Sequence, residues 1–317
     1  MFSRAERTEK LSPLRARTLR RLEVSPAPFH KIALTALGWI YLVITTGAVV
    51  RLTGSGLGCE NWPKCGDTPF PAKEGHAVIE FGNRVIGAIT IGFALLAWLA
   101  ARRTPGLPRR VERMALAVFL GNAAQVPLGG LTVILELHPL LVMAHFLLAL
   151  LVLGAAVVVV VEARGLEKGF AEPVVPRELR FAGIVLAACC LALVVSGAFA
   201  TAAGPHAGDS SEIERLGTPT VSVAAHAAVT AVFGSTFLLI LGYLAAKRAS
   251  LPRLFAGTLL LLALLLVQVG IGETQYHAGL PWWLVLVHVF AAAGVWAGTV
   301  ALATVFWRPP ASFARRH

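Results

Sequence analysis

Charged side chains are scarce in this sequence. They make up 14% of its 317 residues, whereas 56% of the residues are hydrophobic and the mean hydropathy is +0.73. Ordinary soluble domains carry about 25% charged residues, so the composition argues strongly against a soluble globular protein. The apolar runs also lack the regular alternation of polar and apolar residues that a membrane barrel of strands requires. The low share of charged residues and the lack of alternation together favour membrane-spanning helices.

Eight long apolar segments account for most of the chain. Each is close to the ~20 residues that a helix needs to cross a bilayer. They cover approximately residues 32–50, 78–100, 114–134, 139–162, 181–200, 219–245, 254–274 and 282–306. The sequence therefore predicts an all-α polytopic membrane protein with eight transmembrane helices.

The basic residues are confined to a few segments. The net charge is +11, and all but five of the 28 Lys and Arg residues lie in the N-terminal segment, the C-terminal tail and the loops near 101–113, 163–180 and 246–253. Basic loops stay cytoplasmic, so both termini are predicted to face the cytoplasm. The predicted location is the plasma (inner) membrane of a prokaryote. The charge then sets topology and attracts anionic membrane lipid, and we expect no nucleic-acid partner.

These boundaries divide the chain into five parts. We expect a cytoplasmic basic arm, an N-terminal four-helix bundle, a cytoplasmic linker, a C-terminal four-helix bundle and a cytoplasmic tail. Their predicted ranges are 1–31, 32–162, 163–180, 181–306 and 307–317.

Cysteine is also scarce, with four residues in the chain. Cys59 and Cys65 lie in the segment GCENWPKC, in the first loop predicted to face outside. An oxidising compartment favours a disulfide between them, while two independent thiols or a metal-binding pair are the alternatives. No third or fourth metal ligand lies nearby. Cys189 and Cys190 are adjacent inside the fifth span and are expected to act as small buried apolar residues.

The two halves of the chain share a pattern of glycine, glutamine and histidine. Three glycines of TGAVVRLTGSGLGC (46–59) recur in SGAFATAAGPHAGD (196–209) at an offset of 150 residues. QVPLGG (125–130) recurs as QVGIGE (268–273) at an offset of 143. The second offset also relates His145 to His288 and Asn83 to His226. The pattern predicts two parallel-repeat four-helix bundles, related by an axis along the membrane normal.

Two histidines of the C-terminal half are predicted at equal depth in one bundle. His226 and His288 lie near the outer ends of the sixth and eighth spans. Such a pair can clamp a flat metal macrocycle in a bundle core, and imidazole is a good ligand of haem iron. The alternatives are buried histidines with ordinary hydrogen bonds, or a zinc or copper ion that would lack its remaining ligands. A haem ligated on both faces suits electron transfer.

The N-terminal half places His145 opposite Asn83 and adds two ionisable groups. In AVIEFGNRVIG (77–87), Glu80, Asn83 and Arg84 share one helix face. Ionisable residues inside a span are costly and usually functional. One imidazole with a nearby carboxylate suits a site that performs chemistry, and Arg84 or Arg51 is expected to bind a haem propionate. Mutual neutralisation of Glu80 and Arg84 is the structural alternative.

At these residues the chain resembles the haem A synthase family. The resemblance spans nearly all eight helices and includes VVRLTGSGLGCENWPKC, IEFGNR, GPHAGD and the histidines of spans four, six and eight. It implies a disulfide between Cys59 and Cys65. It also implies a haem b cofactor, iron protoporphyrin IX, held by His226 and His288. The N-terminal half, with Glu80 in catalysis, would accept haem O as substrate.

The reaction implied by the resemblance is oxidation of the C8 methyl group of haem O to a formyl group. Glu80 would stabilise positive charge at the macrocycle edge or accept a proton, and the cofactor would relay electrons to an acceptor that the sequence does not identify. A haem O synthase is the implied partner. The alternatives are a membrane b-type cytochrome that only transfers electrons and a transporter built from two bundles.

The chain departs from the family pattern at two places. Asn83 stands where family members commonly have histidine, so His145 alone is expected to ligate the substrate haem. The loop between the fifth and sixth spans lacks the second cysteine pair that many members carry.

Overall fold

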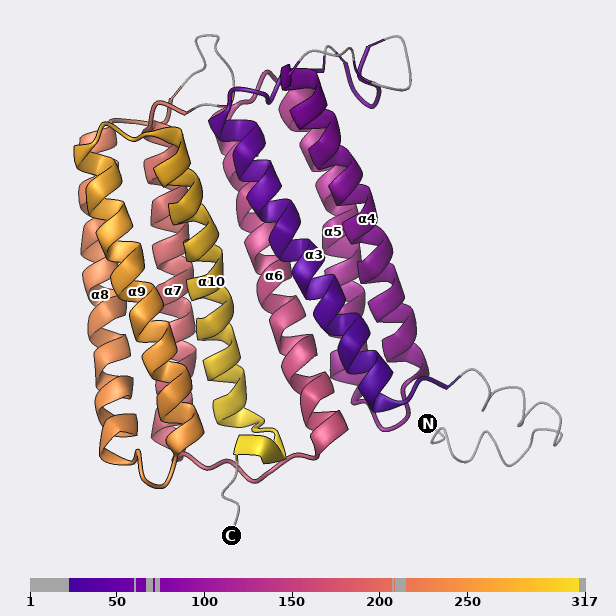
Figure 1. Cartoon of the computed structure of the whole chain (residues 1–317), viewed down its shortest axis with the longest axis vertical. Coiled ribbons are helices and arrows are strands. Elements are labelled where there is room, and N and C mark those ends of the chain that lie inside the picture. Colours follow the sequence, from indigo (N-terminus) through magenta and orange to yellow (C-terminus); the bar gives the residue numbers. More distant parts are fainter. Residues whose placement is uncertain are drawn as a thin grey trace, which may run out of the picture.

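Eight long α-helices and one short 3-10 helix form the described structure (Figure 1). A computed structural model of the chain describes residues 23–59, 61–66, 71, 75–206, 208 and 215–313. Each long helix in this part of the chain has the length and apolar composition needed to cross a membrane. The predicted all-α polytopic membrane fold is therefore confirmed. The elements are α3 (Pro26–Leu52), α4 (Gly75–Arg103), α5 (Arg109–Ile134), α6 (Pro139–Lys168), α7 (Arg177–Ala203), α8 (Pro219–Ala246), α9 (Pro252–His277), α10 (Trp282–Trp307) and η1 (Ala311–Phe313).

Most helices extend beyond the predicted apolar spans. α4 ends at Arg103 and α6 at Lys168, beyond the predicted span ends at residues 100 and 162. Hydropathy marks only the part of a helix that lies in hydrocarbon, whereas backbone hydrogen bonding continues through charged residues into the interface. α3 begins at Pro26, inside the segment assigned to the basic arm, and the fixed φ of proline suits the first helical turn. Residues 1–22 and 314–317 of the predicted arm and tail lie outside the described residues.

The helices form two groups of four. α3 and α5 each contact α4 and α6, and α7 and α9 each contact α8 and α10. We call α3–α6 the first bundle and α7–α10 the second bundle; Figure 1 shows them side by side. That the bundles are repeats of one another stays a prediction.

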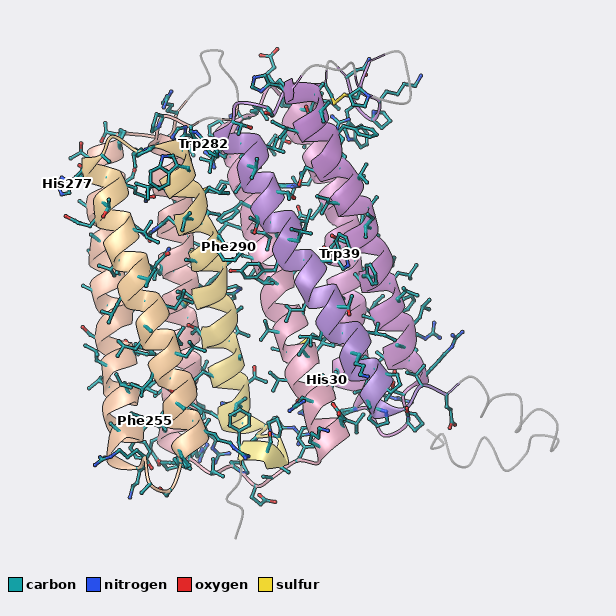
Figure 2. The ribbon with its side chains drawn as sticks, in the orientation of Figure 1. His30, Trp39, Phe255, His277, Trp282 and Phe290 are labelled. Atoms are coloured by element: carbon teal, nitrogen blue, oxygen red, sulfur yellow. A yellow bond between two sulfur atoms is a disulfide. The ribbon has the colours of Figure 1, made fainter. Side chains whose placement is uncertain are left out.

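Two aromatic side chains join the bundles through backbone carbonyls. The Trp296 indole of α10 donates a hydrogen bond of 2.6 Å to the carbonyl of Leu150 on α6. The Tyr41 hydroxyl of α3 donates to the carbonyl of Phe290 on α10, and the two rings meet edge-on with centroids 5.0 Å apart. Phe290 lies between α10 and α3 in Figure 2. Polar groups inside a membrane need such internal partners, so these contacts fix one bundle against the other.

The two ends of the molecule differ in chemistry. At one end, the loop after α3 contains the Cys59–Cys65 disulfide (Figure 2); we call this the disulfide end. At the other end lie the α6–α7 linker, the α8–α9 turn and η1, together with Lys168, Lys247 and Arg248; we call this the basic end. The predicted haem-binding histidines all lie in helix segments nearer the disulfide end.

Candidate functional site

The three predicted histidine ligands pack in the same way. Each half-buried imidazole lies against a glycine of the neighbouring helix, in a contact that we call a glycine seat. An added Cβ would lie 3.2 Å from His145 Cε1 at Gly129, 3.0 Å from His226 Cε1 at Gly197 and 3.1 Å from His288 Cε1 at Gly272. A larger side chain at any of these glycines would displace the ring. Glycine therefore allows each imidazole to pack directly against the neighbouring helix.

Polar contacts orient the same histidines. Ser196 Oγ lies 2.9 Å from His226 Nδ1, which leaves His226 Nε2 as the nitrogen available to a ligand. The amides of Gln125 and Gln268 donate to the backbone carbonyls of His145 and His288, at 3.2 and 2.9 Å. The two contacts are related by the same offset of 143 residues that the sequence shows.

Several polar atoms of these sites are buried without a partner. They are the Nδ1 atoms of His145 and His288 and the side-chain oxygens of Gln125 and Gln268. Buried polar atoms in native proteins are normally hydrogen-bonded, so each such atom requires an explanation. Unpaired imidazole and amide groups on facing helices of a bundle fit a site built around a bound polar group.

The second bundle carries two of the predicted histidine ligands. His226 on α8 and His288 on α10 both lie in helix segments nearer the disulfide end. Within the described ranges, no cluster of three or more His, Cys, Asp or Glu residues is arranged to hold a metal ion. This donor set would suit a haem, because the macrocycle itself supplies most of the iron ligands and the protein needs to add only imidazoles. His226 and His288 therefore fit a haem better than they fit a bare ion.

Asn83 occupies the corresponding position in the first bundle. Thr46 Oγ1 donates to Asn83 Oδ1 at 2.7 Å, and an added Cβ at Gly47 would lie 4.0 Å from the amide. Thr46 and Gly47 precede Ser196 and Gly197 by 150 residues, and the latter pair contacts His226. The structure thus gives Asn83 the same kind of surroundings as His226, with a shorter side chain whose oxygen already accepts a hydrogen bond.

Glu80 and Arg84 bind the loop that carries the disulfide. Glu80 is 5% exposed, and its Oε2 accepts a hydrogen bond of 2.8 Å from the backbone N–H of Cys59. Its Oε1 accepts from Arg84, whose Nη1 also donates to the carbonyls of Pro63 and Lys64, at 3.2 and 2.9 Å. The pair therefore anchors the loop closed by the Cys59–Cys65 disulfide. This is the neutralised ion pair that the sequence offered as an alternative, and a catalytic role of Glu80 stays a prediction.

Arg51 connects the two bundles at the disulfide end. Its guanidinium donates to the carbonyls of Thr201 and His206, at 3.1 and 3.0 Å. His206 Nε2 in turn donates to the carbonyl of Leu280 at 2.7 Å, in the turn between α9 and α10. Arg51 thus joins the first bundle to the GPHAGD loop of the second, and its predicted contact with a propionate stays a prediction.

The contacts of Thr46, Ser196, Gln125 and Gln268 were not predicted from the sequence. The sequence does mark these four residues, because each lies in a segment that recurs at an offset of 150 or 143 residues. The sequence could not show that these side chains touch the histidines and Asn83.

Comparison with known proteins identifies the family. The family model described as "Cytochrome oxidase assembly protein" matches residues 30–300. The chain belongs to this family. The matched range includes helices of both bundles, so His145, His226 and His288 all lie within it.

Curated relatives agree with the family match. The chain is 35% identical over 134 residues to the heme A synthase of Symbiobacterium thermophilum, covering 41% of this chain and 43% of the relative. It is 28% identical over 174 residues to the heme A synthase of Alkalihalophilus pseudofirmus, covering 52% and 57%. A 105-residue stretch is 32% identical to the protoheme IX farnesyltransferase of Halobacterium salinarum, covering 32% and 22%. Each alignment spans less than two thirds of the relative. The predicted membership of the haem A synthase family is confirmed.

Proposed function

We propose that this protein is a haem A synthase, which oxidises the C8 methyl group of haem O to a formyl group. Family membership and the names of the heme A synthase relatives support this activity. The observation that carries the proposal is the difference between the bundles. Where the second bundle holds His226, the first holds Asn83, with the buried carboxylate of Glu80 one helical turn away. The second bundle would thus offer a haem two imidazoles, and the first bundle would offer one imidazole and an acid.

The second bundle would hold the haem b cofactor. His226 and His288 are the residues proposed to hold it, and close packing against Gly197 and Gly272 would keep the two rings in place. When bound, haem b supplies a redox centre that relays electrons away from the oxidised substrate. Ser196 fixes the orientation of the His226 ring and so its ligating nitrogen.

The first bundle would bind haem O through His145. Asn83 is a poor iron ligand, so the opposite face of the substrate haem stays open. Glu80 lies one turn nearer the disulfide end, and its carboxylate would stabilise positive charge at the macrocycle edge or accept a proton released during methyl oxidation. The Cys59 N–H and Arg84 hold this carboxylate in one orientation. Arg84 and Arg51 are the proposed partners of the substrate propionates.

The proposed location is the inner membrane of a prokaryote, with both termini in the cytoplasm. The concentration of Lys and Arg at the basic end supports this orientation, which puts the disulfide end outside. We also propose a haem O synthase as the source of substrate. Similarity to a protein named protoheme IX farnesyltransferase supports this link, because farnesyl transfer to protohaem IX supplies a farnesylated haem.

Expression in a host that makes haem O but no haem A tests the activity. Extraction of membrane haems followed by chromatography should show haem A only when this protein is present. A purified protein that carries haem b while the cells accumulate haem O alone would contradict the proposal. It would favour a b-type cytochrome that only transfers electrons.

A further inference from the structure

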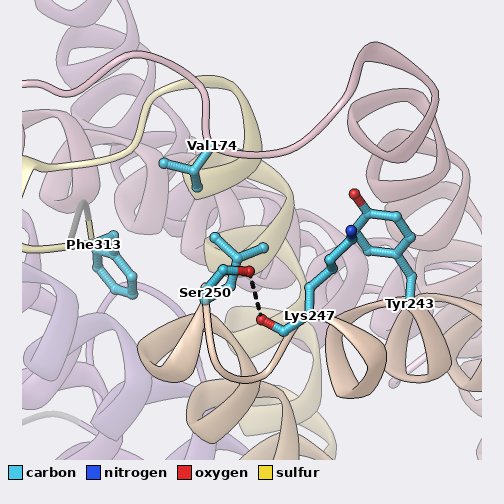
Figure 3. A pocket seen from close by; sticks show the side chains of 6 residues that line it. Val174, Tyr243, Lys247, Ser250 and Phe313 are labelled. Atoms are coloured by element: carbon cyan, nitrogen blue, oxygen red, sulfur yellow. Dashed lines mark hydrogen bonds between the residues drawn. The ribbon is translucent and has the colours of Figure 1, made fainter.

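A cavity at the basic end lies far from the histidine sites. Its volume is ≈ 420 Å³, and Figure 3 shows side chains that line it. The lining residues are Val174 of the α6–α7 linker, Tyr243 and Lys247 at the end of α8, Ser250 and Leu251 of the α8–α9 turn, and Phe313 of η1. Tyr243 follows His226 by 17 residues on α8, which corresponds to roughly 25 Å along the helix. The proposed haem chemistry therefore makes no use of this cavity.

One face of α8 changes from apolar to cationic as it reaches the cavity. Leu239, Tyr243 and Lys247 follow one another at intervals of four residues and so share that face. Leu239 is 77% exposed, as expected for a side chain in contact with lipid tails. The order of alkyl group, aromatic hydroxyl and ammonium matches the order of acyl chain, glycerol and phosphate in a phospholipid. Tyrosine and lysine are typical of this depth in a membrane.

The charge of Lys247 is not neutralised by a neighbour. Among the ion pairs of the described residues, none includes Lys247, whereas Lys168 pairs with Glu167 and Arg110 pairs with Glu162. The turn that carries Lys247 is itself well ordered by hydrogen bonds. Ser250 Oγ donates to the Lys247 carbonyl at 2.9 Å, the bond drawn in Figure 3. The lysine ammonium is thus available to an anion.

The start of α9 adds to the positive potential. Leu251 lines the cavity and is the N-cap residue of α9, which begins at Pro252. The Leu251 N–H already donates to the Lys247 carbonyl and Pro252 has no N–H, so α9 contributes the positive end of its helix dipole, which favours an anion. The remaining walls, Val174, Leu251 and Phe313, are apolar. A cation and a helix N-terminus next to apolar walls suit an amphiphilic anion better than a free ion.

We propose that this cavity binds the phosphate of an anionic phospholipid from the leaflet at the basic end. Lys247 and the Tyr243 hydroxyl donate to the phosphate oxygens, and an acyl chain lies along Leu239. Basic pockets at the ends of transmembrane helices are suitable sites for such headgroups. The bound lipid would contact α8, the α6–α7 linker and η1, and would so link these segments at the basic end.

Native mass spectrometry of the full-length protein tests this site. The protein is titrated with phosphatidylglycerol or with zwitterionic phosphatidylcholine, and the bound fraction is measured. We expect phosphatidylglycerol to bind more tightly, and Lys247→Gln to weaken its binding about fivefold, the effect of one cation near a membrane surface. Tyr243→Phe should weaken it less. Arg248→Gln is the matched control, because Arg248 is an adjacent cation that does not line the cavity, and it should leave binding unchanged.

Three outcomes would overturn the proposal. Equal losses in Lys247→Gln and Arg248→Gln would mean that only diffuse surface charge attracts the lipid. Displacement of phosphatidylglycerol by an equal concentration of inorganic phosphate would mean that the site takes a free anion. Unchanged binding in both Lys247→Gln and Tyr243→Phe would remove the cavity as the site. A visible spectrum equal to that of the unmodified protein shows that a variant has folded. If Lys247→Gln does not fold, Tyr243→Phe tests the site.

Discussion

The two bundles have similar contacts around three histidines and one asparagine but differ in what those residues can ligate. In the second bundle, His226 and His288 each pack against a glycine, at Gly197 and Gly272. In the first bundle His145 packs closely against Gly129, while Asn83 lies farther from Gly47 and accepts a hydrogen bond from Thr46. The first bundle alone has a buried carboxylate beside this position, at Glu80. Under the proposed function, one ligand change and one added acid would distinguish a site for electron transfer in the second bundle from a site for chemistry in the first.

Charged side chains of the first bundle hold backbone segments at the disulfide end. Glu80 and Arg84 tie the first-bundle loop to α4 through the backbone of Cys59, Pro63 and Lys64. Arg51 crosses to the second bundle and binds backbone carbonyls there. Charged residues of the first bundle therefore organise the disulfide end of both bundles.

Removal of either proposed haem ligand of the second bundle should have the largest effect. We expect His226→Ala and His288→Ala to abolish the low-spin spectrum of a haem with two axial histidines, because one imidazole cannot maintain six-coordination. The measurement is the visible and electron paramagnetic resonance spectrum of purified protein. His277→Ala is a matched control, since His277 is exposed at the end of α9 and pairs with Glu273. A full low-spin signal in either ligand variant would show that the cofactor lies elsewhere.

Two substitutions of Glu80 separate its proposed catalytic role from its anchoring role. Glu80→Gln keeps an oxygen that can accept from the Cys59 N–H but removes the negative charge, whereas Glu80→Ala removes both. If the charge acts in the reaction, both variants should form haem A about 100-fold more slowly, the size expected for loss of an acid–base group. Chromatography of extracted haems measures the product.

The anchoring of the loop is measured separately. The measurement is how readily a thiol reagent modifies Cys59 and Cys65 after mild reduction. Only Glu80→Ala should increase this modification, because only that variant lacks an acceptor for the Cys59 N–H. Normal haem A formation by Glu80→Gln would leave Glu80 with the anchoring role alone.

Asn83→His should make the first bundle resemble the second. An imidazole at this position, opposite His145, would convert bound substrate haem towards a six-coordinate low-spin state and slow its oxidation by closing the open face. Spectra recorded with substrate haem bound, before and after the substitution, provide the comparison. An unchanged spin state would show that position 83 does not face the iron.

Filling a glycine seat should have a smaller effect. Gly272→Ala would place a Cβ 3.1 Å from His288 Cε1 and displace the ring slightly, so we expect a reduced haem content and a shifted reduction potential. Gly270→Ala, on the same helix, meets no atom within 4 Å and serves as control. Potentiometric titration of both variants measures the effect. Equal reduction potentials in Gly272→Ala and Gly270→Ala would mean that the seat at Gly272 does not position His288.

Hydropathy, spacing and motif resemblance predict the fold and the candidate ligands but not their contacts. The apolar runs located all eight helices, although charged ends such as Arg103 and Lys168 lie beyond what hydropathy detects. The 143-residue offset paired His145 with His288 and Asn83 with His226. No pattern could show that Glu80 binds the Cys59 backbone or that Arg51 reaches Thr201, because both contacts depend on how loops fold over the helix ends.

The most direct test of unequal haem sites is the spin state of purified protein loaded with substrate haem, compared with that of His145→Ala and His288→Ala. We predict a low-spin signal that survives His145→Ala and disappears in His288→Ala, together with a second, open-faced haem that only His145→Ala removes. Two identical low-spin haems in the unmodified protein, or loss of the low-spin signal in His145→Ala, would contradict the account.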